Sequence, residues 1–470
     1  MQTDFSLAQL ADPDTAESEK ILRTCVHCGF CTATCPTYVL LGDELDSPRG
    51  RIYLIKNMLE EGGPVSAETV KHIDRCLSCL ACMTTCPSGV NYMHLVDHGR
   101  RHIAEHYRRP PAERLLRRLL GVVLTRPALL RAALYAARLA KPFAGLMPTR
   151  LRPLVALAPR AVPAASAMDR PQVFPAEGER RMRVALLPGC AQQVLAPEIN
   201  EATIRLLTRH GCEVVVAPGS GCCGALVHHL GGEAPALGFA RANIDAWESL
   251  RISGGLDAVV VNASGCGTML KDYGFLLRTD PAYAETAART AALARDISEV
   301  MAELGLQLPG PRASRPQQGG PGARGPIDGL RVAYHSACSL QHGQGVDREP
   351  RALLAAAGFT VAEVPEGHLC CGSAGTYNLL QPELAAALRE RKLANIALTG
   401  ADLVAAGNIG CITQLASNAP LPVVHTAQLL DWATGGPRPP GLPPELTRPA
   451  ADGAAPPPGS AATGQARQAQ

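Results

Sequence analysis

The chain has 470 residues, of which 46% are hydrophobic, and its 45 basic and 42 acidic residues give a net charge of +3 at pH 7. This length suits about three domains, and so large an apolar fraction excludes wholesale disorder. The small net charge gives no argument for nucleic-acid binding, and we expect no nucleic-acid partner.

The first twenty residues contain five acidic side chains and no apolar core, so we expect no secretory signal. No run of about 20 uncharged apolar residues occurs, which predicts that no segment spans a bilayer. We therefore expect a cytoplasmic protein. In that reducing compartment its 17 cysteines would serve as metal ligands or redox groups rather than as disulfides.

Two runs of cysteines lie in the first hundred residues. Each has the spacing Cys-x2-Cys-x2-Cys-x3-Cys-Pro, at Cys25–Pro36 and at Cys76–Pro87. Three thiolates spaced in this way can wrap one face of an iron–sulfur cube, while the fourth reaches across to a neighbouring cluster. The runs therefore predict a small α-helical, ferredoxin-type domain with two [4Fe–4S] clusters. Two tetrahedral zinc sites are the alternative, but they require neither the third cysteine nor the repeated Cys-Pro ending.

Cross-ligation between the two runs assigns the eight cysteines to two sets of four. The first cluster takes Cys25, Cys28, Cys31 and Cys86, and the second takes Cys76, Cys79, Cys82 and Cys35. His27 lies inside the first run, but the cysteines already complete the ligand set. We therefore give His27 no ligand role.

A helix is predicted between the two runs, because Ser47-Pro48 is typical of a helix start and Gly62-Gly63 of a helix end. Four apolar side chains share one face of it: Ile52, Ile55, Met58 and Leu59. We expect this face to pack over the clusters and to exclude water from them. Arg49 and Arg51 could offset the negative charge of the clusters, but we interpret both as ordinary surface arginines.

Residues 101–170 carry thirteen Arg and one Lys against three acidic residues, a net charge of +11. Prolines break this Ala-, Leu- and Arg-rich stretch, which predicts short helices such as Glu113–Leu120. We interpret the stretch as a solvated helical connector. The alternative is docking on an acidic partner or peripheral contact with the cytoplasmic face of the inner membrane.

Beyond the connector, short apolar stretches such as Val184–Leu187 and Glu213–Val216 alternate with helical stretches such as Glu198–Thr208. This alternation predicts an α/β fold with a parallel sheet. A Gly- and Pro-rich linker at Gly310–Gly325 divides the region, and a Pro-, Gly- and Ala-rich tail starts at Ala433. We expect the linker to be flexible and the tail to be disordered.

Three cysteine landmarks recur in this region. They are Cys190 and Cys338, 148 residues apart; Cys222-Cys223 and Cys370-Cys371, also 148 apart; and Cys266 and Cys411, 145 apart. Three landmarks at one near-constant offset indicate two copies of one domain. The four cysteines of each copy lie at strand ends or in Gly-rich turns, where the side chains of an α/β unit converge. We expect them to hold a further cluster or to form a redox site.

Two other features of the repeats have plainer interpretations. Cys212 has no counterpart in the second copy, and we interpret it as a buried thiol. Gly219–Gly224 fits the GxGxxG pattern of dinucleotide sites. The second copy keeps the cysteines of this stretch and loses the middle glycine, so we reject nucleotide binding.

Together these patterns divide the chain into six segments. They are a two-cluster ferredoxin-type domain at 1–100, a basic helical connector at 101–181, a first Cys-Cys-Gly domain at 182–309, a flexible linker at 310–329, a second Cys-Cys-Gly domain at 330–432 and a disordered tail at 433–470.

In Cys25–Pro36, in Asp46–Ile52 and in the two Cys-Cys-Gly domains, the sequence resembles the iron–sulfur subunits of glycolate oxidase (glycolate dehydrogenase). The likeness runs from about Ile21 to Trp432. It implies an electron-transfer subunit beside flavin-binding subunits that oxidise glycolate to glyoxylate, with electrons passing on towards a quinone-type acceptor. It implies an enzyme only as a subunit, with no catalytic site for glycolate on this chain.

The Cys-Cys-Gly domains are also similar to those of heterodisulfide reductase, which carry unusual iron–sulfur clusters. That motif ends in Cys-x-x-Cys, whereas here Ala263 and Asn408 stand three residues before Cys266 and Cys411. A heterodisulfide-reductase-like enzyme is therefore one alternative. The other is the iron–sulfur subunit of a dehydrogenase for lactate, another 2-hydroxy acid or glycerol 3-phosphate, although the small lactate-utilisation proteins lack a fused two-cluster module.

Overall fold

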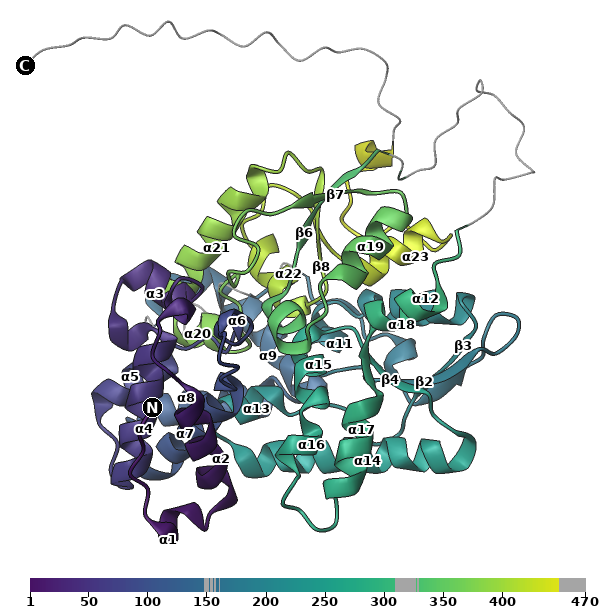
Figure 1. The fold of residues 1–470 in the computed structure, drawn as a ribbon. Coiled ribbons are helices and arrows are strands. Elements are labelled where there is room, and N and C mark those ends of the chain that lie inside the picture. The colour runs from purple at the N-terminus through teal and green to yellow at the C-terminus, as the bar shows by residue number, and fades with distance from the viewer. Residues whose placement is uncertain are drawn as a thin grey trace, which may run out of the picture.

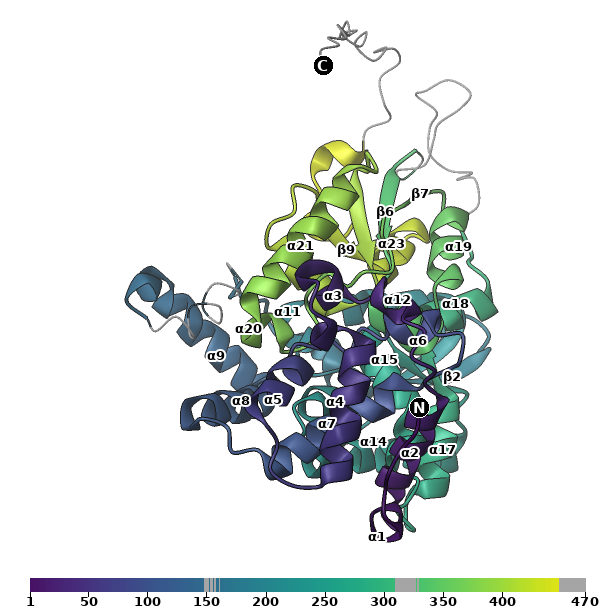
Figure 2. The same ribbon diagram turned by 60° about the vertical axis from the view of Figure 1, so that its left-hand side comes forward.

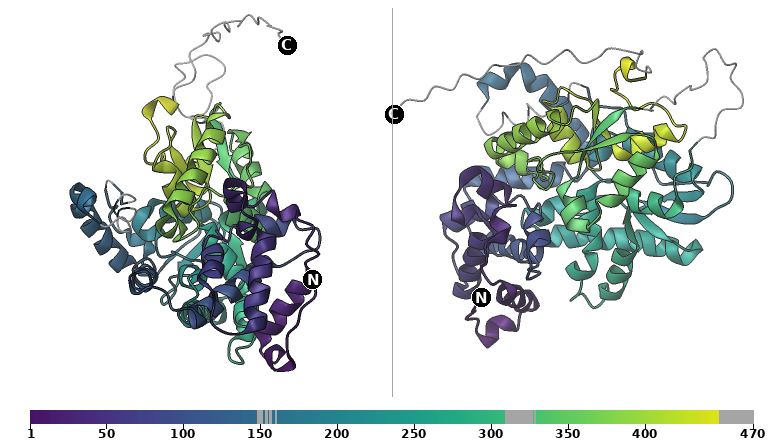
Figure 3. Two further views of the ribbon diagram at one scale, coloured as in Figure 1. Left: turned by 90° about the vertical axis from the view of Figure 1, so that its left-hand side faces the viewer. Right: turned by 45° about the horizontal axis from the view of Figure 1, so that its top comes forward.

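The computed structural model describes residues 1–147, 161–308 and 329–447, together with positions 152, 155, 158, 159 and 327 (Figure 1). A helical module at the N-terminus lies against two α/β units, as two further views also show (Figure 3). The linker expected at Gly310–Gly325 lies outside the described residues.

The N-terminal module is built from short helices around the two cysteine runs. They are α1 (Leu7–Leu10), α2 (Pro13–Thr24), α3 (Pro36–Leu41), α4 (Pro48–Glu61), α5 (Ala67–Asp74), α6 (Ala81–Thr85) and α7 (Tyr92–His106), with 3₁₀ turns η1 (Phe30–Thr32) and η2 (Glu44–Asp46). The helix expected between the runs is α4. Ser47 caps its start by accepting from the Gly50 N–H, and Gly62 ends it in the left-handed conformation. Its predicted apolar face is buried in the core of the module.

The connector differs from the expectation at both of its ends. Helix α7 continues to His106, so the boundary expected at residue 100 falls inside a helix. Gln172–Phe174 forms a strand, β1, that pairs with the first sheet, so the first α/β unit begins before the expected residue 182. Such a short edge strand has too few residues to show a periodic pattern.

Between these ends, α8 (Pro111–Val123) and α9 (Pro127–Ala140) project from the body of the molecule (Figure 2). The helix expected at Glu113–Leu120 is thus confirmed. Among the described residues no single helix has the length and hydropathy of a membrane span. Only the pair Pro111–Val123 and Pro127–Leu146, bent by 120° at the break between them, meets that test together.

The first α/β unit is a five-stranded sheet in the order β1-β3-β2-β4-β5, in which only β1 is antiparallel. Its further strands are β2 (Met182–Leu186), β3 (Cys212–Val216), β4 (Ala258–Val261) and β5 (Ala294–Asp296). Its helices are α11 (Gln192–Leu195), α12 (Glu198–Arg209), α13 (Ala225–His229), α14 (Glu233–Gly254), α15 (Ser264–Lys271), α16 (Tyr273–Leu276), α17 (Ala284–Leu293) and α18 (Ile297–Leu304). Neighbouring residues of β2 enter different cores, because the sheet is covered on both faces.

The second unit is a four-stranded parallel sheet in the order β7-β6-β8-β9. Its strands are β6 (Arg331–His335), β7 (Thr360–Glu363), β8 (Leu403–Ala406) and β9 (Val423–His425). Its helices are η5 (Ser339–Gln344, a π-helix), α19 (Arg348–Ala356), α20 (Tyr377–Leu380), α21 (Pro382–Ala397), α22 (Ile409–Ala416) and α23 (Thr426–Ala433). Apart from β1, the strand order repeats that of the first unit, which confirms the predicted duplication and the predicted α/β class.

The two units share one apolar core, to which β2 and β3 contribute from the first and β6 and β8 from the second. Helix α12 packs on α23, and α18 packs on α19, so corresponding helices make reciprocal contacts across the junction. Arg205 and Arg209 of α12 both pair with the buried carboxylate of Asp431 on α23. The halves are therefore one body related by an approximate two-fold axis.

The tail expected from Ala433 is ordered in its first part. Leu442 is buried in the shared core, Leu446 packs against it, and Pro444–Thr447 forms a 3₁₀ turn. The disorder expected at 433–470 is therefore wrong for residues 433–447, because two large apolar side chains are enough to fix the chain to the core. The remaining residues, 448–470, lie outside the described part of the chain.

Candidate iron–sulfur sites

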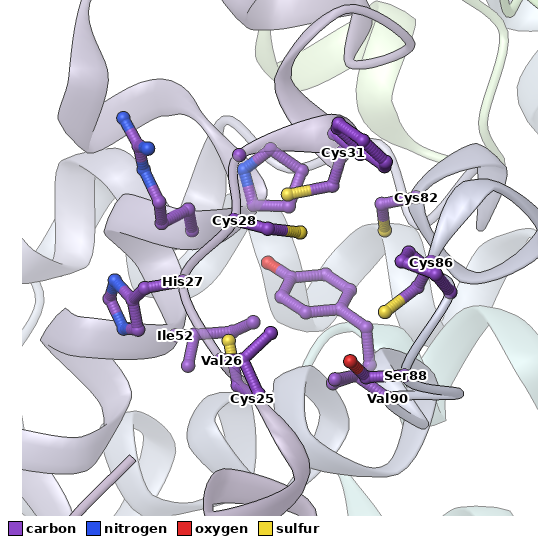
Figure 4. A pocket seen from close by; sticks show the side chains of 16 residues that line it. Cys25, Val26, His27, Cys28, Cys31, Ile52, Cys82, Cys86, Ser88 and Val90 are labelled. Atoms are coloured by element: carbon purple, nitrogen blue, oxygen red, sulfur yellow. The ribbon is translucent and has the colours of Figure 1, made fainter.

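Five of the predicted ligands line one cavity. They are the four assigned to the first cluster, Cys25, Cys28, Cys31 and Cys86, and Cys82 of the second set. Figure 4 shows their sulfur atoms facing the same space. Ile52 and Val90 line the same cavity, so the thiols face a largely apolar surrounding. The structure thus brings together the four cysteines that cross-ligation predicts for the first cluster, and this donor set fits an iron–sulfur cube.

The two cysteine runs share one backbone course. The second residue after the first cysteine is left-handed in both, at His27 (φ 56°) and Ser78 (φ 49°). The fourth residue after the first cysteine is left-handed in both runs as well, at Gly29 (φ 83°) and Leu80 (φ 63°). Residues other than glycine seldom adopt such angles, and where they do the surrounding structure imposes them. Both loops are therefore curled in the same way around the space that their thiols face.

The four cysteines of the second predicted set are also brought together, and they are more deeply buried than those of the first set. Burial raises the pKa of the Cys82 thiol well above its ordinary value, and the nearby thiols of Cys79, Cys76 and Cys35 raise it further. Burial also raises the pKa of Cys79, with Cys338 of the second repeat as the next cause. Cys82 lines the first cavity as well, so the two sites share a wall.

Arg51 corrects a sequence expectation. We interpreted it as a surface arginine, but its side chain is 1% exposed and donates to Asp46, to Thr37 and to the His72 carbonyl. Its Nη1 also donates to Cys35 Sγ at 3.7 Å. Burial alone would lower the pKa of the guanidinium, but Cys76, Tyr92, Cys35 and the Asp46 carboxylate together raise it above its usual value. Arg51 is thus a fixed positive charge beside the second set of thiols.

Arg49 behaves as expected, because it pairs with Glu44 at the surface. Gly50, between the two arginines, is fixed by close approach: a Cβ there would lie 2.0 Å from the Glu44 carbonyl oxygen. The Arg-Gly-Arg sequence thus lets the backbone pass closely over η2 while the second arginine turns inward. Composition alone does not distinguish the two arginines.

In the first repeat the four landmark thiols are in contact with one another in a chain that runs Cys190, Cys222, Cys223, Cys266. The contact with Cys190 lowers the pKa of Cys222, but contact with Cys223 and burial outweigh it and raise that pKa to about 12. Such thiols are not nucleophilic at neutral pH, whereas a bound metal removes their protons. This donor set fits a metal cluster better than free thiol chemistry.

The second repeat reproduces this arrangement. Its thiols are in contact in the order Cys338, Cys370, Cys371, Cys411, and the first pair is 3.7 Å apart between sulfur atoms. Each repeat thus collects cysteines from the carboxyl ends of parallel strands, at the point where the strand order reverses.

The glycine of the Cys-Cys-Gly motif has one structural role in both repeats. Gly372 has φ 88°, and a Cβ there would lie 2.5 Å from the Ala385 carbonyl oxygen on α21. Gly224 has φ 88° as well, and a Cβ there would lie 3.1 Å from the Ala236 carbonyl oxygen on α14. In both, the glycine N–H donates to the sulfur of the first motif cysteine at 3.4 Å. The glycine therefore lets the motif loop approach the following helix.

The second set of N-terminal thiols contacts the second repeat directly. Leu77, Cys79 and Ala81 form one buried apolar cluster with Cys370 and Tyr377. The second repeat in turn adjoins the first. Helix α15, which carries Cys266, packs on η5, which follows Cys338. The Ser264 and Ser339 hydroxyl oxygens are 2.6 Å apart across this contact. The four cysteine sites therefore form a row of neighbours. The first N-terminal set adjoins the second, the second adjoins the second repeat, and the second repeat adjoins the first repeat.

Two polar side chains beside the second repeat were not among the sequence candidates. His335 is buried next to Cys371 and Cys411, and Lys392 is buried near Cys370 and Cys371. Aligning the two repeats gives the signal that could have found them, because both positions are occupied by different residue types in the first repeat. Cys212, by contrast, lies in the shared apolar core at the start of β3, as expected.

Comparison with known proteins agrees with this geometry. Residues 21–90 match the 4Fe-4S dicluster domain family, and residues 184–271 and 332–416 each match the cysteine-rich domain family CCG. A solved structure of a hypothetical protein from Helicobacter pylori matches with a TM-score of 0.51 at 11% identity, over 91% of this chain and 73% of that one. At this identity the likeness concerns the fold alone.

Among curated proteins, the chain is 42% identical to the glycolate oxidase iron-sulfur subunit of Escherichia coli, over 92% of this chain and 99% of that protein. It is 32% identical to a probable glycolate oxidase iron-sulfur subunit of Bacillus subtilis, over 88% and 94%. Lactate utilization protein A of Bacillus licheniformis, at 27% identity, matches 53% of this chain. The chain belongs to the family of glycolate oxidase iron–sulfur subunits.

Proposed function

We propose that this chain is the electron-transfer subunit of a glycolate dehydrogenase complex. In it, flavin-binding subunits would oxidise glycolate to glyoxylate, and electrons would leave towards a quinone-type acceptor. The observation that carries the proposal is the row of four cysteine sites within one body. The Escherichia coli and Bacillus subtilis relatives are a glycolate oxidase iron-sulfur subunit and a probable one, which supports glycolate as the substrate of the complex.

Bound [4Fe–4S] clusters would supply one-electron redox centres at the N-terminal sites. The first would be held by Cys25, Cys28, Cys31 and Cys86, and the second by Cys76, Cys79, Cys82 and Cys35. Support comes from the first cavity, which Cys86 lines although it belongs to the second run. The chain's own contribution is to exclude water and to place the positive Arg51 against Cys35.

The assignment of Cys86 is tested by comparing single variants. Cys86→Ser should perturb the same electron paramagnetic resonance signal as Cys28→Ser, because both residues border the first cavity. Cys79→Ser should perturb the other signal. If Cys86→Ser reproduced the signature of Cys79→Ser instead, cross-ligation would be wrong.

The first N-terminal cysteine site forms the end of the row that the flavin partner would approach. Cys28 is exposed, and Val26 and Phe30 beside it are 68% and 63% exposed. Apolar side chains exposed around a redox site are typical of a surface that a partner protein covers. We place the approach of the flavin subunit here and the acceptor beyond the repeats.

We further propose that the protein is cytoplasmic and touches the cytoplasmic face of the inner membrane through α8 and α9. Exposed apolar side chains on and just after these helices support this: Leu115, Leu119, Leu129, Leu139, Phe143 and Leu146. They lie within the strongly basic stretch, and apolar and basic groups together favour an anionic lipid surface. Co-flotation with anionic but not with neutral vesicles is the expected result.

The function is tested by two rates in the intact complex, glycolate to an artificial dye and glycolate to quinone. Replacing Cys222 and Cys223, or Cys370 and Cys371, by Ser should leave the dye rate and abolish the quinone rate. Unchanged quinone reduction in both double variants would show that the motif cysteines are structural thiols without a redox role. Glycolate oxidation by the isolated chain would overturn the proposal as a whole.

A further inference from the structure

The second repeat contains a buried histidine that faces its thiols. His335 is the last residue of β6, three residues before Cys338. One of its ring nitrogens lies within 4.8 Å of both Cys371 Sγ and Cys411 Sγ, and all three side chains are buried. His335 ends β6, and Cys371 lies in the Cys-Cys-Gly loop that follows β7. Cys411 lies in the first turn of α22, the helix that follows β8. Tertiary structure alone brings them together.

Both ring nitrogens of His335 lack a hydrogen-bond partner among the described residues, although the side chain is only 2% exposed. Leaving a buried polar group unsatisfied costs about 1–3 kcal/mol. Two other buried histidines use both nitrogens. His210 contacts the Leu206 carbonyl and the Gln307 N–H, and His425 contacts the Asn262 carbonyl and the Ala427 N–H. Both ring nitrogens of His335 are therefore free to bind a group held by the neighbouring thiols.

The first repeat shows that histidine is not required by the fold. Leu187 stands at the corresponding position, at the same offset of 148 that relates Cys190 to Cys338. It is buried in the apolar core of its own unit. The strand and the cysteine site therefore form equally well with an apolar residue there. Histidine is specific to the second site.

Asn408 stands where the related Cys-x-x-Cys motif would have a further cysteine, three residues before Cys411. Its Nδ2 contacts Cys411 Sγ at 3.6 Å, but an amide nitrogen donates and has no lone pair for a metal. The second site would thus have four thiolates and no other ligand, unless His335 supplies one.

We infer that His335 is a metal ligand of the second repeat, binding iron together with Cys371 and Cys411. The inference rests on the proposed presence of an iron–sulfur group in this repeat. Where the related Cys-x-x-Cys motif would supply a further thiolate, a neutral imidazole leaves the iron less negatively charged. Histidine ligation accordingly raises the reduction potential of iron–sulfur centres. The two repeats would then differ in ligand set, four cysteines in the first and four cysteines with a histidine in the second.

The test uses the full chain, purified anaerobically after growth on [15N]histidine. The signal to examine is the one that disappears in the Cys370→Ser/Cys371→Ser double variant. Pulsed electron paramagnetic resonance of that signal should show a nitrogen coupling that changes on labelling. The coupling should be lost in His335→Leu, which copies the first repeat, and in His335→Cys. His335→Cys should keep the iron and lower the reduction potential of the iron–sulfur group in this repeat, because a thiolate replaces the imidazole.

His210→Gln is the matched control, since His210 is buried but bonded to protein at both nitrogens. It should leave the coupling unchanged. A signal without histidine coupling in the unmodified chain, or a coupling that survives in His335→Leu, would overturn the inference alone. If no iron signal depended on Cys370 and Cys371, the proposed iron–sulfur occupancy of the repeat would fail, and with it this inference. Circular dichroism is the check that each variant is folded.

Discussion

The two repeats have the same strand order and the same four cysteines, yet their surroundings differ in charge. Ala236 and Ala385 meet the motif glycines in the same way, and seven residues further along the helices stand Asn243 and Lys392. Asn243 donates to the Cys222 carbonyl at 2.9 Å. In the second repeat a buried ammonium group replaces this neutral amide. Duplication thus preserved the thiols, while the residues around them diverged.

The repeats also differ in how they meet the N-terminal module. The second repeat makes an apolar contact through Leu77, Tyr377 and Leu388. The first makes a charged one, in which Asp97 of α7 pairs with His228 and His229 of α13. A dry contact beside the thiols suits electron transfer, whereas the charged contact holds the module in place. We therefore expect the second repeat to be the electronic neighbour of the module.

The largest expected effect comes from removing the motif cysteines of one repeat at a time. Cys370→Ser/Cys371→Ser should remove all iron of the second repeat and also shift the signal of the second N-terminal cluster, because Cys79 lies beside Cys370. Cys222→Ser/Cys223→Ser should remove the iron of the first repeat and leave both N-terminal signals unchanged. Iron analysis and electron paramagnetic resonance measure both effects. Equal disturbance of the N-terminal signals by the two variants would break the comparison.

The apolar contact is tested by shortening one side chain of α21. Leu388→Ala should lower the free energy of unfolding by about 2–5 kcal/mol, because it opens a cavity between the repeat and the module. Leu398→Ala, just beyond the same helix, is the control. Its side chain is 76% exposed, and the expected change is within about 0.5 kcal/mol. Urea unfolding under anaerobic conditions compares the two, and equal losses would contradict the assigned contact.

The buried ammonium group sharpens the electronic part of the comparison. Burial lowers the pKa of Lys392, and the nearby thiols of Cys371 and Cys370 act against that shift. Lys392→Met should lower the reduction potential of the iron–sulfur group in the second repeat by roughly 60 mV. For a one-electron couple this corresponds to a tenfold change in the equilibrium constant. Arg391→Met changes a half-exposed arginine on the same helix and should have little effect. A redox titration giving equal shifts for both variants would refute a specific role of Lys392.

The smallest effect concerns pH and the charged contact. Burial alone would lower the pKa of His228, but Asp97 outweighs it and raises that pKa. The pair of Asp97 and His228 therefore contributes its full stabilisation of the folded state below about pH 6.5. This stabilisation is lost as the pH rises through the folded pKa of His228. Between pH 6 and 8 the unfolding free energy should fall by about 1 kcal/mol more in the unmodified chain than in His228→Gln. Parallel pH profiles would show that the pair contributes nothing.

Much of this molecule can be predicted from its sequence, because cysteine spacing is a direct record of ligand geometry. The two N-terminal runs predicted the clusters, and the offset between Cys190 and Cys338 predicted the duplication. The alternation of short apolar stretches with helical stretches predicted the α/β class. The inward turn of Arg51 could not be predicted, because its role depends on Asp46 and Thr37, which fold beneath it. The order of the four sites could not be predicted either, since it arises from packing between distant segments.

The roles of the two polar residues in the second repeat were missed for a related reason. His335 and Lys392 lie on a strand and a helix whose patterns look ordinary, and a lone buried histidine or lysine gives no spacing signal. Only the contrast with Leu187 and Asn243, at superposable places in the first repeat, makes them visible. A duplicated fold therefore serves as its own control.

The central claim, that this chain is an iron–sulfur protein with two N-terminal clusters, is tested most directly by metal analysis. Protein purified anaerobically from iron-replete cells should contain at least about eight iron atoms per chain, with Mössbauer spectra of two [4Fe–4S] clusters and further iron from the repeats. Stoichiometric zinc without iron under the same conditions would contradict the account.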